Sequence, residues 1–531
     1  MQEKPAATSK KRMSFGNVAM LLVVTTLIGQ VLGFLRTKIV NANFPALGPH
    51  STDSYFAAFN IPDFFFYTLA AGALGVVFIP VLAERLHKSD KKGMWELSSS
   101  LINMLGIVMC VAAVIIFVFA KPLIHHIVAP NLTSQQLDVA ATIMRCLALN
   151  PLFFTISGIL NAVQQTLGRF FFYAIAPLFY NSSIILSVFI FRHSSIGIEG
   201  LGIGALVGAI LQLGVVCLGL RGTSFRWRPT ILWRSKDFRM ILRQLPPRSL
   251  DQGIDQIESI VETNFARRLG EGNISYYSNA YTLQTAPTLL VGTTISTAVF
   301  PLLNKRLAQG RPDLFRRDFL RILRLMIWVA TPTTIVSYFC RGYLARLIFT
   351  RNAPEIALIF GYLTPAIFFG TLYTIMSRWF YAQKDTRTPL FVSVFTIGLN
   401  ILLVSMWARV TSYGVAGLGM AQSVVAIAEV LVLGGIMVYR DRGLLNWAFW
   451  NGCIRILSVS GFTLVVGAIM LSLMPLGLHD VGFGLVLRLS VITGVIFTTH
   501  LLVSALFGLE EVQPVFRWIG RLFSRPTKVP Y

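Results

Sequence analysis

The sequence predicts an all-α polytopic membrane protein of about fourteen transmembrane helices, arranged as two parallel six-helix repeats followed by a C-terminal helix pair. Hydrophobic residues make up 54% of the 531 residues and charged residues only 13%. A soluble domain needs roughly a quarter of its residues charged to cover its surface. The apolar residues fall in long stretches separated by short basic segments, and the two halves of the chain share residues at a nearly constant spacing.

The apolar stretches give the expected spans, because about twenty apolar residues cross the hydrocarbon core of a bilayer as a helix. They lie at residues 15–40, 53–83, 97–119, 136–163, 173–193, 198–221, 241–269, 276–304, 319–341, 354–382, 390–412, 414–438, 450–474 and 484–508. The first stretch follows a basic segment, as in a signal peptide, but it is long and lacks a small-residue cleavage site. It is therefore predicted to be a retained helix.

The basic residues predict how the chain is oriented in the membrane. With the N-terminus inside, the cytoplasmic segments hold roughly three times as many Lys and Arg residues as the outer segments, in agreement with the positive-inside rule. An even number of spans then returns the C-terminus to the cytoplasm. A net charge of +23 is also typical of nucleic-acid-binding proteins. Here, however, the basic residues occur in short groups that would face anionic lipid. We expect membrane lipids and no nucleic acid as partners.

An internal repeat predicts the arrangement of the first twelve helices. Matching residues recur at a spacing that drifts from 221 to 217 residues: Ser54 and Ser275, Pro80 and Pro301, Arg85 and Arg306, Gln164 and Gln383, Asn181 and Asn400, and Gly200-Leu201-Gly202 and Gly417-Leu418-Gly419. Because six is even, both copies have the same orientation. Parallel repeats of this kind place a substrate site at their interface and move by rocking.

The repeat predicts four parts of the chain. They are an N-terminal lobe at residues 1–222, a basic interfacial linker at 223–240, a C-terminal lobe at 241–439, and two added helices with a cytoplasmic tail at 440–531.

Ionisable residues inside predicted spans are costly, so each marks a candidate site. The first span carries Arg36 and Lys38. They either line a cavity or extend to the outer interface, since long basic side chains snorkel. The second span places polar and aromatic residues on one helix face: Asp53, Phe56, Asn60, Asp63 and Tyr67. Because the rest of the helix is apolar, this face should look into water or protein.

The seventh span has the densest group of charges. One stripe, with spacings of three and four residues, holds Arg248, Asp251, Asp255, Glu258 and Glu262. The stripe either pairs with basic residues on neighbouring helices, such as Arg36, Arg145 or Arg378, or lines a hydrated central cavity. Four acids beside one base exceed what a single ion pair requires, which favours the cavity.

The motifs of catalysis and metal binding are not found in the sequence. It contains no GxxxxGK[ST], HExxH or GxSxG motif, and the five cysteines are widely separated without a CxxC pair. We therefore expect no enzyme activity, no cofactor and no metal ligands. The loops are too short for a nucleotide-binding domain. Transport would draw on an ion gradient, the membrane potential or the gradient of the substrate.

Four segments carry a family resemblance: Gln30 to Arg36 (QVLGFLR), Asp53 to Pro62 (DSYFAAFNIP), Phe78 to Glu84 (FIPVLAE) and Phe380 to Pro389 (FYAQKDTRTP). With these motifs, the chain resembles the MurJ/MviN lipid II flippases of the multidrug/oligosaccharidyl-lipid/polysaccharide exporter superfamily. The resemblance implies two six-helix lobes around a central cavity and a terminal helix pair whose groove takes a polyprenyl tail. It also implies alternating access that carries the peptidoglycan precursor lipid II to the outer leaflet of the bacterial plasma membrane. An ion gradient is one of the three energy sources named above, so a coupling ion is a candidate further partner.

The resemblance assigns roles to two residues and shows some departures. Arg36 matches an arginine that the family uses in its cavity, and Asp53 matches the aspartate of its second helix. Three residues stand where many members have basic residues, namely Gln30, Phe66 and Tyr67, and the segment 279–282 replaces an Asp-Arg pair. The alternatives are a flippase for another polyprenyl-linked glycan, a cation-coupled drug antiporter of the same superfamily, and a non-transporting scaffold of an envelope assembly complex.

Overall fold

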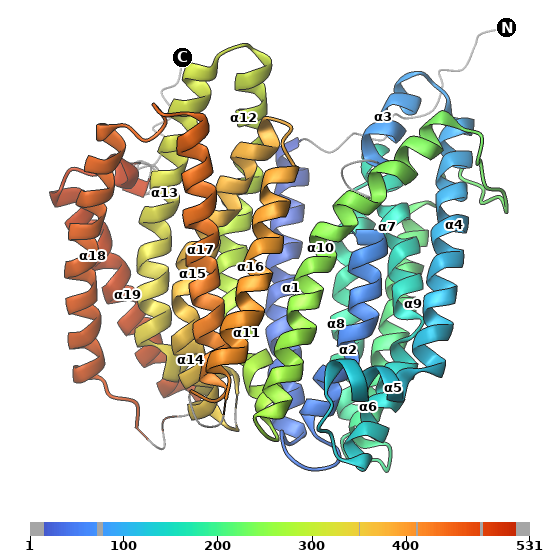
Figure 1. The fold of residues 1–531 in the computed structure, drawn as a ribbon, viewed down its shortest axis with the longest axis horizontal. Coiled ribbons are helices and arrows are strands. Elements are labelled where there is room, and N and C mark those ends of the chain that lie inside the picture. The colour runs from blue at the N-terminus through green and yellow to red at the C-terminus, as the bar shows by residue number, and fades with distance from the viewer. Residues whose placement is uncertain are drawn as a thin grey trace, which may run out of the picture. The chain divides into compact units, whose positions relative to one another are not determined.

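The computed structural model describes residues 15–71, 78–349, 351–409, 413–477, 480, 482–513 and 515–516. The described residues form helices joined by loops, which confirms the predicted all-α class. The chain divides into two compact units, Met1–Arg268 and Leu269–Tyr531 (Figure 1). Each unit is described below by itself.

The described residues of the N-terminal unit form ten α-helices. They are α1 (Phe15–Asn43), α2 (Thr52–Phe66), α3 (Ile79–His87), α4 (Lys91–Val118), α5 (Ala120–Leu123), α6 (Ser134–Leu147), α7 (Asn150–Thr166), α8 (Phe171–Phe191), α9 (Gly200–Gly219) and α10 (Lys236–Arg268). Short π-helices continue α2 at Tyr67–Ala71 and α5 at Ile124–Val128, and a 3-10 turn precedes α9 at Gly197–Glu199.

In the C-terminal unit, the part of the chain that the structure describes forms nine α-helices. They are α11 (Asn273–Pro287), α12 (Thr294–Ala308), α13 (Pro312–Phe339), α14 (Arg341–Ile348), α15 (Ala353–Ala382), α16 (Arg387–Trp407), α17 (Ala416–Arg440), α18 (Trp447–Leu473) and α19 (Gly482–Leu506). A π-helix joins α11 to α12 at Thr288–Thr293, and a 3-10 turn follows α19 at Glu510–Val512.

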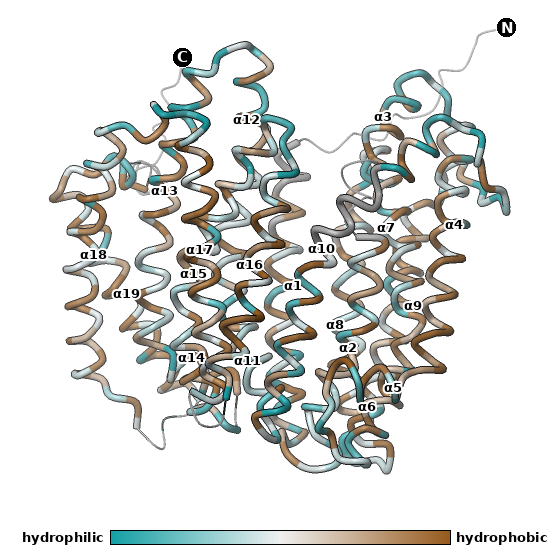
Figure 2. The backbone as a smooth tube through the Cα atoms, viewed as in Figure 1, coloured by the Kyte–Doolittle hydropathy of each residue, from teal (hydrophilic) through white to brown (hydrophobic). Residues whose placement is uncertain are grey.

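Within the described residues, twelve helical segments are long and apolar enough to cross a membrane. This number is roughly consistent with the predicted fourteen. The predicted spans outside the twelve are 53–83, which contains the undescribed residues 72–77, and 241–269, which carries the charged stripe of α10. Hydrophobic residues run along the middle of the long helices, and hydrophilic residues gather at their ends and in the loops (Figure 2).

The internal repeat is confirmed by the helix boundaries. A shift of 221 residues carries α2 onto α11 and α4 onto α13, with both ends of each helix matching. The same shift aligns the first residues of the two π-helices, Tyr67 and Thr288. Because π-helices are rare, their recurrence at one place in both copies supports duplication. The final pair, α18 and α19, lies outside the two copies, as predicted.

Helix α10 packs with the N-terminal unit, although the repeat makes it the first helix of the second copy. It lies against α2 and against the π-helices at 67–71 and 124–128. The unit boundary therefore falls after Arg268, where Gly270 and Gly272 both adopt positive φ angles. Such angles favour glycine and let the chain turn sharply. The predicted lobe boundaries at 222 and 240 follow the repeat, and they remain predictions.

The segment between α9 and α10 runs along the polar side of α4. The side-chain amide of Asn103 donates to the carbonyls of Arg228 and Thr230, at 2.7 and 2.9 Å, and accepts from the indole of Trp227 at 2.8 Å. Arg228 also pairs with Glu96 at 2.9 Å. These contacts cover one face of α4 with the basic segment that the sequence predicts as a linker.

Helices α8 and α9 approach closely because α9 presents glycines to α8. A Cβ atom at Gly208 would lie 3.0 Å from the carbonyl oxygen of Tyr180 and 3.1 Å from its Cα, whereas a Cβ at Gly214 would meet nothing within 4 Å. Backbone atoms cannot move aside as a flexible side chain can. We expect Gly208→Leu to destabilise the protein by about 1–3 kcal/mol through overpacking. Thermal unfolding in detergent measures this, with Gly214→Leu as the matched control. Equal melting temperatures for the two variants would contradict this account of α8–α9 packing.

Candidate functional site

A cavity of about 480 Å³ lies inside the N-terminal unit, between α1, α2, α7, α8 and α9. Its walls are mainly aromatic and its polar groups are few. The lining residues are Arg36, Tyr55, Phe56, Phe59, Asp63, Phe66, Tyr67, Phe154, Gly158, Asn161, Tyr180 and Gln212. Among these, Arg36 is the base and Asp63 the acid, so the cavity combines one charge of each sign with aromatic walls.

Arg36 enters the cavity from α1 and is held by α8. Its Nη1 atom donates to the side-chain oxygen of Asn181 at 3.1 Å. The repeat counterpart of Asn181, Asn400, makes a different contact within its own unit. Asn400 donates to Gln422 at 2.9 Å. Held on one side by an amide, the guanidinium of Arg36 keeps further donors for a ligand.

Asp63 shares its side of α2 with the aromatic residues that line the cavity. Phe56, Asp63 and Tyr67 were predicted on one face, and the structure places all three in the cavity wall. The aromatic rings contact one another edge to face. Phe66 lies 5.6 Å from Phe154, whose ring lies 5.1 Å from that of Tyr180. Edge-to-face packing of this kind gives a wall of fixed shape.

The other two polar residues predicted on this face, Asp53 and Asn60, point elsewhere. They are seven residues apart and so lie on one line of α2, about 60° around the helix from Phe56 and Asp63. Asn60 accepts hydrogen bonds from Ser259 at 3.2 Å and Thr263 at 3.5 Å, both on α10. The second helix therefore divides its polar residues between the cavity and the contact with α10.

Asp53 belongs to a buried network at the end of α10. Its carboxylate is fully buried and lies 3.5 Å from Nη1 of Arg267, which is only 6% exposed. Arg267 also donates to the carbonyl of Asn131 at 3.0 Å and to the side chain of Gln136 at 2.8 Å. Gln136 in turn reaches the carbonyl of Gly48 at 3.0 Å. This network joins the end of α10 to the N-terminal unit.

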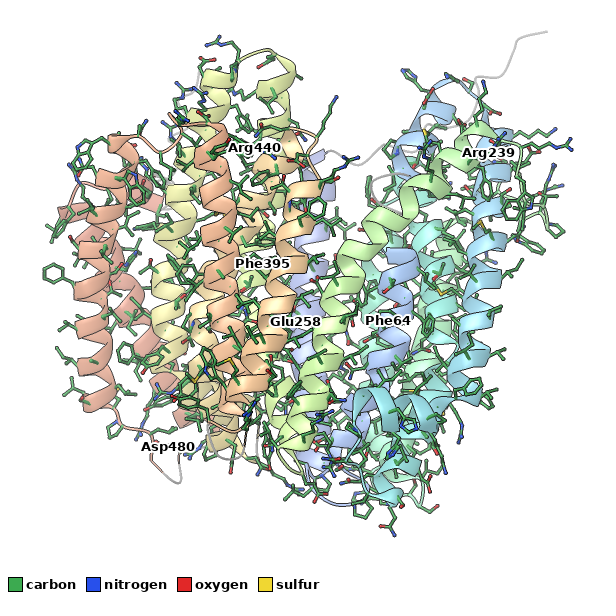
Figure 3. All side chains as sticks on the ribbon, in the orientation of Figure 1. Phe64, Arg239, Glu258, Phe395, Arg440 and Asp480 are labelled. Atoms are coloured by element: carbon green, nitrogen blue, oxygen red, sulfur yellow. The ribbon has the colours of Figure 1, made fainter. Side chains whose placement is uncertain are left out.

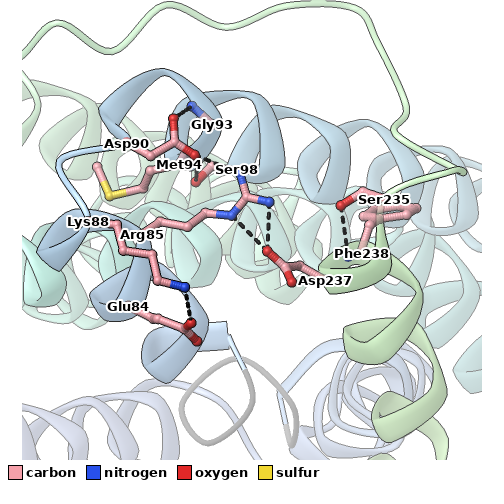
Figure 4. Close-up of polar contacts among 10 residues, drawn as sticks. All are labelled: Glu84, Arg85, Lys88, Asp90, Gly93, Met94, Ser98, Ser235, Asp237 and Phe238. Atoms are coloured by element: carbon pink, nitrogen blue, oxygen red, sulfur yellow. Dashed lines mark hydrogen bonds and ion pairs between the residues drawn. The ribbon is translucent and has the colours of Figure 1, made fainter.

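A second charged cluster joins the start of α10 to the same unit (Figure 4). Arg85 of α3 donates to Asp237 of α10 through Nε at 2.9 Å and Nη2 at 2.6 Å, and reaches Asp90 at 3.2 Å. Phe238, beside Asp237, is completely buried. Asp90 also caps α4 by accepting from the backbone of Gly93 at 2.8 Å. The two clusters fix both ends of α10 to the N-terminal unit.

Lys38 lies outside the cavity. It is exposed, two residues beyond Arg36 on α1, and is not among the lining residues. Its position agrees with the alternative that a basic side chain extends from the helix toward an interface. Arg36 and Lys38 therefore take different positions, although the sequence groups them.

The stripe on α10 is described only in its second half. The side chains of Arg248 and Asp251 lie outside the described residues. Asp255 is exposed, Glu258 is half-buried, and Glu262 is buried. Figure 3 shows Glu258 well along α10 from Arg239, which is near the helix start. The exposure of the side chains thus falls along the stripe toward the end of α10. The role of the stripe in transport stays a prediction.

Three polar lining residues were not singled out from the sequence: Asn161, Tyr180 and Gln212. Each lies in a predicted span that is otherwise apolar, and Tyr180 directly precedes the repeated Asn181. Polar residues inside a membrane span are costly even when they are uncharged. Their presence in apolar spans is therefore the sequence signal that identifies these three residues.

The motif around Asp385 forms the turn between α15 and α16. The Asp385 carboxylate accepts from the backbone of Arg387 and Thr388, from the Thr388 hydroxyl at 2.6 Å, and from Arg440 of α17 at 2.6 Å. Partial burial opposes ionisation, but these hydrogen bonds outweigh it and hold the pKa of Asp385 at about 2. Lys384 adopts a positive φ of 62° in this turn. The residues that carry the family resemblance here stabilise a loop.

A sequence model of the family described as "Lipid II flippase MurJ" matches residues 47–492 of the chain. Named bacterial proteins are similar over most of their length. The "Probable lipid II flippase MurJ" of Borreliella burgdorferi is 24% identical over 427 residues, covering 79% of this chain and 83% of that protein. The "Lipid II flippase MurJ" of Burkholderia cenocepacia is 25% identical over 432 residues, covering 79% and 82%.

Solved structures share the fold. The structure described as "Lipid II flippase MurJ, inward closed conformation" superimposes with a TM-score of 0.75 at 21% identity, covering 92% of this chain and 98% of that chain. An inward-facing multidrug resistance MATE family transporter of the MOP superfamily has a TM-score of 0.62 at 15% identity, covering 83% and 98%. At these identities the similarity concerns the fold alone.

Proposed function

Because the chain belongs to the MurJ lipid II flippase family, we propose that it moves lipid II from the inner to the outer leaflet of the bacterial plasma membrane. The match of the family model to residues 47–492 carries this proposal. The movement supplies the peptidoglycan precursor for cell wall synthesis. The bias of basic residues supports an orientation with both termini in the cytoplasm.

The cavity of the N-terminal unit supports a role in holding the headgroup. A lipid-linked glycan needs a polar path across the membrane for its headgroup, while its polyprenyl tail can stay in the bilayer. Arg36 offers a planar set of donors suited to a diphosphate, and Asn181 holds it toward the cavity. The aromatic side chains that face this cavity offer flat surfaces of fixed shape.

The carboxylate of Asp63 is a candidate binding site for a coupling ion. An anionic diphosphate beside Arg36 would meet the charge of Asp63 in the same cavity. A proton or a metal cation on Asp63 would remove that repulsion, since like charges in a low-dielectric site are costly. We infer that the ion that couples to transport is taken up at this carboxylate.

The terminal helix pair supports a role in holding the tail. Helices α18 and α19 pack on each other and on α13. A buried polar contact fixes them, in which His500 bonds through one ring nitrogen to Thr463 and through the other to the carbonyl of Trp328, both at 3.1 Å. The outer surface of α18 exposes large apolar residues, including Leu457 and Leu473. A polyprenyl chain would find an apolar surface there.

Rescue of a bacterium depleted of its own lipid II flippase tests the proposed function. We expect the expressed chain to restore growth and cell shape, and the purified protein to move labelled lipid II across proteoliposome membranes. A well-expressed, membrane-inserted protein that restores neither would overturn the proposal. Restoration of a different polyprenyl-linked glycan instead would identify the alternative flippase, and drug efflux without rescue would identify the antiporter.

A further inference from the structure

A second cavity, of about 290 Å³, lies within the C-terminal unit at the start of α13 and α18. Four arginines of α13 line it, and they are Arg316, Arg317, Arg321 and Arg324. The first turn of α18 contributes Ala448 and Phe449, and the segment after α19 contributes Glu510. One wall of the cavity, from α13, is therefore strongly basic. Another wall is the N-terminus of α18, which is the positive end of the helix dipole.

The acids near this cavity are already paired. Arg316 pairs with Asp441 at 2.5 Å. Arg324 pairs with Glu510 at 2.9 Å and with Glu511 at 2.8 Å. Asp313, the other acid of the lining, is held by Arg311 at 2.9 Å. These pairs leave the positive charge of Arg317 and Arg321 poorly compensated.

Arg317 and Arg321 are the two lining arginines whose positive charge is least compensated by nearby acids. Arg317 lies 3.7 Å from Asp318, whose carboxylate is bound more closely by Arg306 at 2.8 Å. Arg321 is exposed in the cavity wall and makes no hydrogen bond or ion pair with the residues that the structure describes. An anion in the cavity would satisfy both.

The repeat shows what covers the same surface in the other copy. A shift of 221 residues places Arg317, Arg321 and Arg324 over Glu96, Ser100 and Asn103 of α4. In the N-terminal copy these three residues bind the segment between α9 and α10. In the C-terminal copy the connection from α17 to α18 spans only residues 441–446. The arginines thus line an open cavity where the first copy has a covered surface.

The residues around the cavity place it at a membrane–water boundary. Trp447 and Trp450 in the first turn of α18 are 76% and 48% exposed, and tryptophan is enriched at membrane interfaces. Ile454 and Leu457 follow on the same helix with exposed apolar side chains. The hydrocarbon-facing surface of α18 therefore begins within about one turn of the basic cavity.

We propose that this cavity binds the phosphate of an anionic membrane lipid. Arg317 and Arg321 bind the phosphate oxygens, and the first turn of α18 contributes the positive end of its dipole. The hydrocarbon chains lie along the part of α18 that follows Trp450. The volume suits a phosphoglycerol headgroup and is too small for a disaccharide-peptide headgroup. A polyprenyl diphosphate presents the same chemistry from a second source. The site is distinct from the cavity at Arg36 and does not depend on which substrate is transported.

Lipid titration of the purified full-length protein tests this proposal. We expect phosphatidylglycerol to raise the melting temperature above the value in phosphatidylcholine, and the effect to weaken with salt. In the double variant Arg317→Gln/Arg321→Gln, the apparent affinity for phosphatidylglycerol should fall by about tenfold or more, since two charge-assisted contacts are lost. The matched control is Arg226→Gln/Arg234→Gln, which removes two exposed arginines from the segment after α9 and should keep the wild-type affinity.

A second variant keeps the test decisive if the double variant fails to fold. Ala448→Glu adds a carboxylate to the first turn of α18, where the helix dipole favours it, and places it in the cavity beside the arginines. It should fold normally and lose phosphatidylglycerol binding. Wild-type binding by Ala448→Glu, or by a folded Arg317→Gln/Arg321→Gln variant, would overturn the proposal. A parallel titration with polyprenyl diphosphate distinguishes the sources, since the lipid that binds more tightly and loses more affinity in the variants is the ligand.

Discussion

Replacing Arg36 by glutamine is expected to abolish rescue of flippase-depleted cells while leaving the protein in the membrane at its normal amount. Helices α1 and α8 also pack along their length apart from the bond to Asn181, so the substitution should leave these helices together. What is lost is the cavity's positive charge and its planar donors. A charge-assisted hydrogen bond is worth about 1.5–3 kcal/mol, so losing two such bonds to a diphosphate would slow transport by more than tenfold. Growth rescue and flipping in proteoliposomes measure the effect.

Lys38→Gln is the matched control for Arg36→Gln. It removes the same charge from the same helix, but Lys38 is exposed and is not among the residues that line the cavity. We expect Lys38→Gln to rescue growth nearly as well as the wild type. If both variants rescue, Arg36 has no role in transport. If both fail, the charge at the end of α1 matters for insertion or orientation, and the cavity is not the cause.

The sequence predicts much of the fold because its strongest signals are local. Spans follow from the length of apolar stretches, and the repeat follows from residues that keep one spacing, such as Pro80 and Pro301. The helix boundaries of α4 and α13 then coincide under the same shift. These features depend on each helix and its neighbours in the chain, which is the information a single sequence holds.

The site was only partly predictable, because a helical period defines a face without naming its neighbour. Asp53 and Asp63 were grouped on α2, yet Asp63 lines the cavity and Asp53 pairs with Arg267, which is more than two hundred residues away. The position of α10 depends on that contact and on the pair of Arg85 with Asp237. Contacts between such distant residues leave no periodic signal in one sequence, and so the place of α10 in the N-terminal unit could not be predicted.

Arg267→Met is expected to be the most destabilising single substitution proposed for this protein, costing on the order of 3–5 kcal/mol. The change removes the cation next to Asp53, whose carboxylate is fully buried, and also removes donors to Asn131 and Gln136. Removing a cationic neighbour from a buried carboxylate is costly, because burial disfavours the charged form. Thermal unfolding of the purified protein should show a clearly lower melting temperature.

Arg268→Met provides the control, because Arg268 is the exposed neighbour of Arg267 and contacts only the ring of Phe265 among its described contacts, at 5.5 Å. The double variant Asp53→Leu/Arg267→Met separates the pair from the packing around it. When both charges are replaced by apolar side chains, neither partner is left as a buried charge beside an apolar residue, and such replacements are often neutral. The double variant should therefore recover much of the lost stability. A single variant as stable as the control would show that this pair does not hold the end of α10. A double variant no more stable than Arg267→Met would assign the loss to the bonds with Asn131 and Gln136 instead.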